Sequence, residues 1–202
     1  SSFRLENGSR LVLLPEDHAG YTEICSLVTR GRRQAPKGEY ALPDRSFEHG
    51  LDHCLALWLP ATTDGNEKND LLTAHWLAAY FPKRCWLAAS LDLGPHDAQR
   101  LQRLQAIAQA AGLPLMACGD VQMHVRSRRM LHDTLAAIRH GCPVAELGYR
   151  ALPSGERHLR PRERLAELFP AAWLAASVAI AERCRFRLEQ LHYRYPREVV
   201  PA

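Results

Sequence analysis

The sequence contains few lysines and only a small excess of positive charge. Lys37, Lys68 and Lys83 are the only lysines among 26 basic residues, and the formal net charge is +4. A charge this small is compatible with nucleic acid nearby but does not indicate it. High genomic GC content would produce the same arginine bias, and we favour that explanation over phosphate binding.

Several motifs that would define a function class are missing. The six cysteines form no Cys-x-x-Cys pair, which argues against a zinc ribbon or a redox pair. Most of them lie in apolar runs, as expected for buried free thiols in a reducing cytoplasm. No signal peptide is recognisable, and no apolar run approaches the ~20 residues of a membrane span, so we expect a cytoplasmic protein without a membrane partner. Glycine-rich nucleotide loops and a Gly-x-Ser-x-Gly nucleophile elbow are also absent.

Strands and helices alternate along the first two thirds of the chain. Asn7-Gly8 predicts the turn of a hairpin over residues 3–14. The pattern then predicts helices over 19–33, 70–81, 97–111 and 127–140, and strands over 54–59, 85–91 and 113–118. Short strands that are apolar on both faces and alternate with helices are typical of a buried parallel sheet. The predicted fold class is therefore α/β.

The pattern changes after Gly148, where prolines separate helical stretches predicted over 162–169 and 171–184. We therefore assign residues 1–147 to the α/β unit and residues 148–202 to a helical or irregular segment.

The densest polar cluster, residues 119–129, follows the last predicted strand. Ligands of parallel α/β sheets bind at the C-terminal ends of the strands, so a site is expected here. Asp120 and His124 could share a divalent metal, because carboxylate and imidazole groups both ligate such ions. Alternatively, Asp120 caps the following turn and His124 is an ordinary loop residue.

Three arginines of this cluster, Arg126, Arg128 and Arg129, could clamp phosphates through their guanidinium groups. The positive end of a helix dipole at this position disfavours arginine. We therefore favour a solvated face with ion pairs to Asp133 or another acid.

A second polar cluster precedes the strand over 54–59 and consists of Glu48, His49, Asp52 and His53. Together with Asp120 and His124, several of these side chains could supply the ligands of a metal-dependent phosphoesterase or exonuclease. Loop histidines are more often surface residues than ligands, and we favour that interpretation.

Residues 119–129, which read GDVQMHVRSRR, resemble a signature of the error-prone C-family DNA polymerases of bacteria. That family has Gly-Asp-Val-His-Met-His, then Arg-Ser-Arg-Arg and an Asp-Thr-Leu-x-Ala-Ile-Arg helix. The similarity runs in order through almost the whole chain, which makes it more specific than any single motif. It also includes residues 20–40, 133–139, 156–160, 180–186 and 191–196.

The resemblance implies a PHP (polymerase and histidinol phosphatase) domain with a (β/α)₇-type barrel, whose first metal ligands precede the segment matched here. Asp120 matches a late metal ligand of that domain, but Gln122 stands where the family has a second ligand, a histidine. The amide oxygen of glutamine is a much poorer ligand for zinc or manganese than imidazole. We therefore expect a degenerate site and no cofactor in this chain. Zn or Mn would be bound only by an intact site, and Mg would serve the parent polymerase.

The resemblance further implies a parent enzyme that performs translesion DNA synthesis and extends on both sides of this segment. Its expected partners are the rest of the polymerase chain, DNA, a sliding clamp and accessory mutagenesis proteins. We expect this segment to be structural and to contain no catalytic residue. The alternatives are a metal-dependent phosphoesterase or exonuclease of the PHP superfamily, and a stand-alone binding module.

A barrel without its opening strands would expose an unpaired sheet edge. We therefore expect the isolated chain to be marginally stable and to dimerise or repack, with the hairpin over 3–14 covering the edge.

Overall fold

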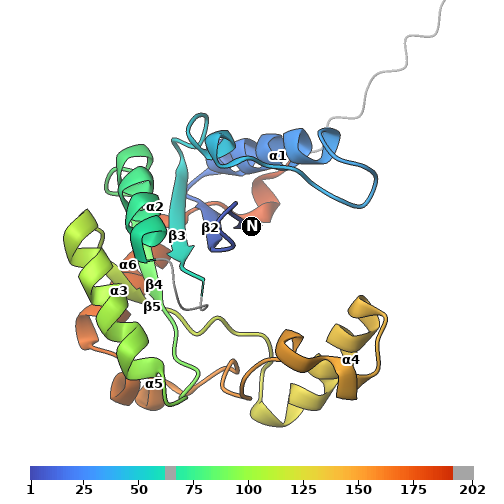
Figure 1. Ribbon diagram of the computed structural model, residues 1–202. Coiled ribbons are helices and arrows are strands. Elements are labelled where there is room, and N and C mark those ends of the chain that lie inside the picture. The colour runs from blue at the N-terminus through green and yellow to red at the C-terminus, as the bar shows by residue number, and fades with distance from the viewer. Residues whose placement is uncertain (62–66, 193–202) are drawn as a thin grey trace, which may run out of the picture.

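The computed structural model describes residues 1–61 and 67–192. Its centre is a five-stranded sheet with the strand order β1-β2-β3-β4-β5 (Figure 1). β2 pairs antiparallel with both β1 and β3, whereas β4 pairs parallel with both β3 and β5. The strands are β1 (Ser2–Arg4), β2 (Arg10–Pro15), β3 (Cys54–Leu59), β4 (Cys85–Ala89) and β5 (Leu115–Ala117).

The α/β class is therefore confirmed, and the predicted hairpin is present as β1 and β2. The expected (β/α)₇-type barrel is not confirmed, because β1 and β5 lie at opposite edges of an open sheet. The hairpin pairs with β3 through β2 and thereby extends the sheet on that side.

Three helices cover one face of the sheet. They are α1 (His18–Arg33), α2 (Glu67–Tyr80), which connects β3 to β4, and α3 (Asp97–Ala111), which connects β4 to β5. Ala56 and Trp58 of β3 are fully buried in this layer. Gly20 permits the close approach of α1, because a Cβ atom there would lie 2.2 Å from the carbonyl oxygen of His53.

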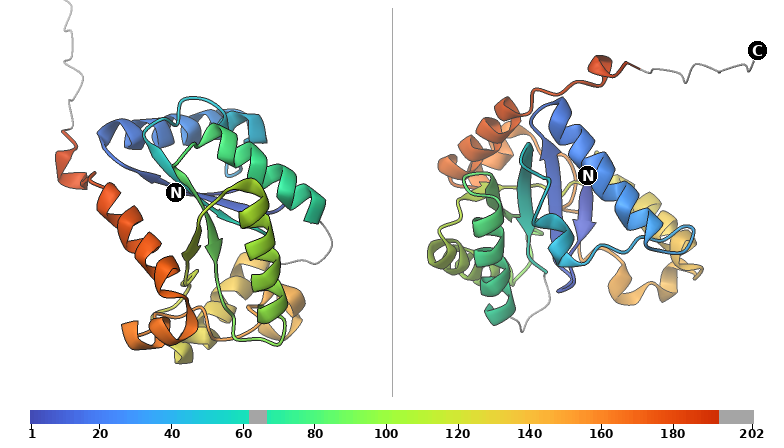
Figure 2. Two further views of the ribbon diagram at one scale, coloured as in Figure 1. Left: turned by 90° about the vertical axis from the view of Figure 1, so that its left-hand side faces the viewer. Right: turned by 90° about the horizontal axis from the view of Figure 1, so that it is seen from above.

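The opposite face is covered by α6 (Ala171–Arg183), as the left view of Figure 2 shows. Ile180 of α6 packs in one buried cluster with Leu55 and Met116, and Ser177 Oγ donates a hydrogen bond of 2.8 Å to the carbonyl of Ala117. Cover on both faces explains why β3 is apolar at every position. The proposed boundary near Gly148 stays a prediction, although α6, which follows it, packs directly on the sheet.

Between β5 and α5 (Arg162–Leu168) the chain forms a lobe, which we call the α4 lobe and define as residues 121–160. It contains η2 (Arg126–Arg128), α4 (Arg129–His140), η3 (Val144–Glu146) and η4 (Gly148–Arg150). Its two ends lie side by side, because Gln122 N donates to Arg157 O at 2.8 Å and Leu159 N donates to Met123 O at 3.2 Å. The α4 helix is seen apart from the sheet in Figure 1.

Two short 3₁₀ helices, η1 (Asp44–Phe47) and η5 (Leu188–Gln190), complete the described elements. None of the helices described is both long and apolar enough to cross a membrane.

Candidate functional site

Two aspartates follow neighbouring parallel strands at their C-terminal ends. Asp92 comes shortly after β4, and Asp120 comes shortly after β5. Because parallel strands end at the same edge of a sheet, the fold brings both side chains together. Asp120 has a φ of 40°, in the left-handed region that aspartate tolerates better than most residues. Its side chain is only 9% exposed, so its charge requires a partner within the protein.

Arg157 forms ion pairs with both of these aspartates. Its Nε lies 3.1 Å from Asp92 Oδ1, and its Nη1 lies 2.7 Å from Asp120 Oδ2. Arg10 of β2 approaches the same Asp120 oxygen at 2.5 Å, and Arg100 of α3 lies 3.3 Å from Asp92 Oδ2. We call these five residues the strand-end cluster. Its guanidinium groups compensate both carboxylates with charge supplied by the protein itself.

The surroundings of the cluster set the protonation of its acidic groups. Burial raises the pKa of the Asp92 carboxyl, but the hydrogen bond and charge of Arg157, with Arg100, outweigh burial and hold that pKa below its ordinary value. Asp92 is therefore ionised at neutral pH and has no proton to donate as a general acid. Burial raises the pKa of the Cys118 thiol, whose Sγ accepts a hydrogen bond from Asp120 N at 3.4 Å. A protonated thiol is a poor nucleophile.

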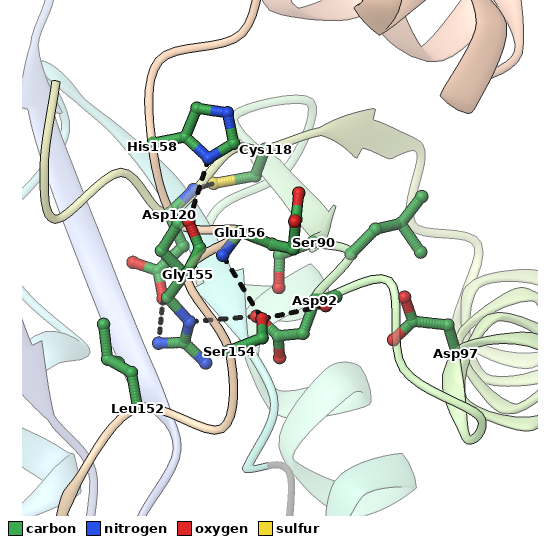
Figure 3. A network of polar contacts seen from close by, with 12 residues as sticks. Ser90, Asp92, Asp97, Cys118, Asp120, Leu152, Ser154, Gly155, Glu156 and His158 are labelled. Carbon is green, nitrogen blue, oxygen red and sulfur yellow. Dashed lines mark hydrogen bonds and ion pairs between the residues drawn. The ribbon is translucent and has the colours of Figure 1, made fainter. Parts of the chain in front are cut away.

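The loop at residues 154–160 forms hydrogen bonds to the backbone that follows β4. Ser154 Oγ donates a hydrogen bond of 2.9 Å to the carbonyl of Asp92 (Figure 3), and Arg160 Nη2 donates one of 2.9 Å to the carbonyl of Leu91. These contacts hold the returning end of the α4 lobe against the sheet.

The residues of the predicted metal site around Asp120 have different surroundings in this structure. Gln122 and His124 are both exposed, and Asp120 contacts two arginines instead. Within residues 1–61 and 67–192, no three His, Cys, Asp or Glu side chains are grouped so that they could hold a metal ion. The metal roles of Asp120 and His124, and the loss of that site through Gln122, stay predictions.

The three predicted phosphate-binding arginines have different surroundings. Arg129 Nε lies 3.3 Å from Asp133 Oδ2, the ion pair that we favoured as the alternative to phosphate. Arg126 pairs with Glu156 of the opposing loop. Arg128 is exposed and forms no ion pair with any residue that the structure describes. Phosphate binding by this group stays a prediction.

The members of the second predicted cluster do not meet at one point. Each contacts a different residue: Glu48 contacts Trp76, His49 contacts Tyr80, Asp52 contacts Arg84, and His53 contacts Asp17. The hydrogen bond and charge of Asp17 raise the pKa of His53. Each of the four side chains thus has a contact of its own, and none of these contacts involves a metal ion shared by the four.

Sequence reasoning missed most of the strand-end cluster. Asp92 follows a strand as Asp120 does, and that position was the available signal. The sequence pointed to Arg157 only because residues 156–160 resemble the corresponding segment of the family. Nothing local marks Arg10 or Arg100, because their pairing depends on how the sheet assembles.

These features define an α/β protein with an ion-paired cluster at its parallel strand ends. No family model matches the sequence. Three curated relatives, each called an error-prone DNA polymerase, are 52% identical over 202 residues in Methylococcus capsulatus, 52% over 201 in Pseudomonas fluorescens and 51% over 202 in Pseudomonas aeruginosa. The matches cover 100% of this chain and 19% of each relative. The chain is therefore homologous over its whole length to one segment of the error-prone DNA polymerases, and spans about a fifth of their length.

Proposed function

We propose that this chain is a structural segment of an error-prone DNA polymerase and contains no polymerising site. The observation that carries the proposal is the match along 100% of the chain to proteins of that name, at 52% identity in the Methylococcus capsulatus relative. The strand-end cluster supports the structural part. Nucleotidyl transfer by two metal ions needs carboxylates that are free to ligate both ions, whereas Asp92 and Asp120 are engaged by arginines.

The proposal includes a degenerate PHP-type metal site at Asp120. The guanidinium groups of Arg10 and Arg157 supply the positive charge beside Asp120 that a divalent cation would supply in an intact site. Gln122 offers no imidazole. We therefore assign no Zn or Mn to this segment, and place the Mg of the polymerase outside it. The strands that would close a PHP-type barrel would come from the rest of the polymerase chain.

The whole enzyme is proposed to act in translesion synthesis in the cytoplasm, with DNA, a sliding clamp and accessory mutagenesis proteins as partners. In this setting Arg128, which has no ion-pair partner among the described residues, is available for a phosphate.

Two experiments test the proposal. In the first, this chain replaces the matched segment of the Methylococcus capsulatus polymerase, and primer extension is measured on intact and damaged templates. We expect the grafted enzyme to extend primers, and a folded, soluble graft without extension would contradict the proposed function.

In the second, elemental analysis is performed on the purified chain and on two variants, Asp120→Ala and the control Glu163→Ala, at an exposed residue of α5. We expect no stoichiometric divalent metal in any of the three proteins. Close to one Zn or Mn per chain, lost in Asp120→Ala and retained in Glu163→Ala, would show that the site is intact.

A further inference from the structure

The α4 helix presents a row of apolar side chains to solvent. Met130 is 82% exposed, Leu135 58% and Ile138 71%, and Leu131 is also exposed. Their helical spacing places them on one side of α4. We call these four residues the α4 apolar face. Val144 and Tyr149, in the following turns of the lobe, are exposed as well.

The α4 lobe is joined to the sheet by polar contacts and not by a shared core. None of its residues belongs to the three buried apolar clusters that the described residues form. Its attachments include Arg157 in the strand-end cluster, Ser154 on the Asp92 carbonyl, and Arg160 Nη2, which donates to the Leu91 carbonyl at 2.9 Å. Contiguous exposed apolar surface on a soluble protein typically marks an interaction site.

We infer that the α4 apolar face is an internal docking surface, which packs against another part of the polymerase chain. The inference rests on the proposed function. The relatives are about five times as long as this chain, which matches 19% of their length, so most of the polymerase lies outside the described structure. Because the rest of that chain is covalently linked to this segment, it is always present near the α4 apolar face at high local concentration.

The charged residues of the lobe indicate which kind of surface would be complementary to it. Residues 121–152 include five arginines but only Asp133 and Glu146 as acids. Arg128, Arg139 and Arg150 form no ion pair with a described residue. The complementary surface is therefore apolar and bordered by acidic side chains. A second copy is a poorer occupant, because a two-fold contact would bring the same arginines toward each other.

The test uses the grafted Methylococcus capsulatus polymerase with a photo-crosslinking residue, benzoylphenylalanine, in place of Ile138. The control carries it in place of Leu72, which is 59% exposed on α2. After irradiation, we expect position 138 to form cross-links to peptides outside the matched segment, at least ten times more than position 72. Cross-links confined to the matched segment, cross-links to a second copy, or no cross-links would overturn the inference.

A second measurement does not depend on the cross-linker. Met130→Glu combined with Ile138→Glu should lower the melting temperature of the graft but leave that of the isolated chain unchanged, and Leu72→Glu should change neither. An equal loss in the isolated chain would overturn the inference. So would an isolated chain that light scattering shows to be a dimer and that the double variant converts to a monomer.

Failure of the docking inference and failure of the proposed function are distinguishable. A graft that extends primers without cross-links outside the matched segment overturns only the docking surface. A graft that is inactive but cross-linked from position 138 to the rest of the polymerase retains the docking surface and overturns the proposed function.

Discussion

Arg157 and Asp120 are 37 positions apart in the sequence, yet the arginine Nη1 lies 2.7 Å from the aspartate Oδ2. The same guanidinium group contacts Asp92 through Nε. One side chain from the returning end of the α4 lobe thus holds the acidic ends of two neighbouring strands.

Removing this guanidinium group should destabilise the fold. In Arg157→Met, Asp92 and Asp120 each lose a largely buried partner, and we expect the free energy of unfolding to fall by about 3 kcal/mol. Urea unfolding at pH 7 measures this change. Arg128→Met, at an exposed arginine without an ion pair in the described structure, is the control and should stay within about 0.5 kcal/mol of the parent. Equal stability of both variants would contradict a structural role for the cluster.

Acid should weaken the same cluster. The pKa of Asp92 lies below the ordinary value of about 3.9, so the ionised group stabilises the fold above that value. This contribution is lost as the pH falls through the lowered folded-state pKa. We therefore expect Asp92→Asn to be less stable than the parent chain at pH 7, and the difference to shrink below about pH 4. Thermal unfolding between these pH values measures it, and a difference that does not change with pH would argue against the ion pairs.

The cysteines should differ sharply in reactivity. Burial raises the pKa of both Cys54 and Cys85 to about 12, whereas Cys25 is exposed on α1. Because the thiolate is the reactive form, iodoacetamide at pH 8 should modify Cys25 first and reach the two buried thiols only after denaturant is added. Mass spectrometry of the digested protein locates the modification. Alkylation of Cys85 in the folded chain at the rate of Cys25 would refute the buried position of β4.

The approach of α1 to β3 should not tolerate a side chain at Gly20. In Gly20→Ala the added Cβ would lie 2.2 Å from the His53 carbonyl oxygen, so the helix must shift. We expect a loss of about 1–3 kcal/mol in unfolding free energy. Gly94→Ala is the matched control, because its Cβ would meet no atom within 4 Å. A Gly20→Ala variant as stable as the control would show that α1 packs elsewhere.

Local and burial signals made much of the sheet predictable from the sequence. Asn7-Gly8 marks the hairpin turn, and Gly112 ends α3 with a φ of 66°, so both follow from nearby residues alone. The apolar run of β3 indicates cover on two faces, and α1, α2, α3 and α6 provide it.

The beginning of α4 and the closure of the sheet were not readable in the same way. The predicted helix from 127 begins at Arg129, because residues 126–128 form a 3₁₀ turn and Arg128 makes no side-chain cap. A barrel requires two edges to pair, and that pairing depends on long-range geometry that no local pattern contains.

The candidate site was predictable only in part, for a similar reason. The strand-end position of Asp120 follows from the parallel sheet, but its partners arrive from β2 and from the far end of the α4 lobe. Ion pairs between distant segments have no sequence period that would reveal them.

The two ends of the α4 lobe contact each other, and this affects how the sequence and length of this region can vary. The chain leaves the sheet after Asp120 and returns beside the same point, where Met123 forms a parallel bridge with His158. A chain segment whose two ends already contact each other behaves as an insertion in the fold. Each doubling of the length of such a segment raises the entropic cost of closing the loop by only about 0.6 kcal/mol. The sheet and α6 keep their contacts as long as the returning segment, residues 154–160, is retained. Evolution can therefore reshape this lobe, and the surface it offers to the rest of the enzyme, without rebuilding the domain beneath it.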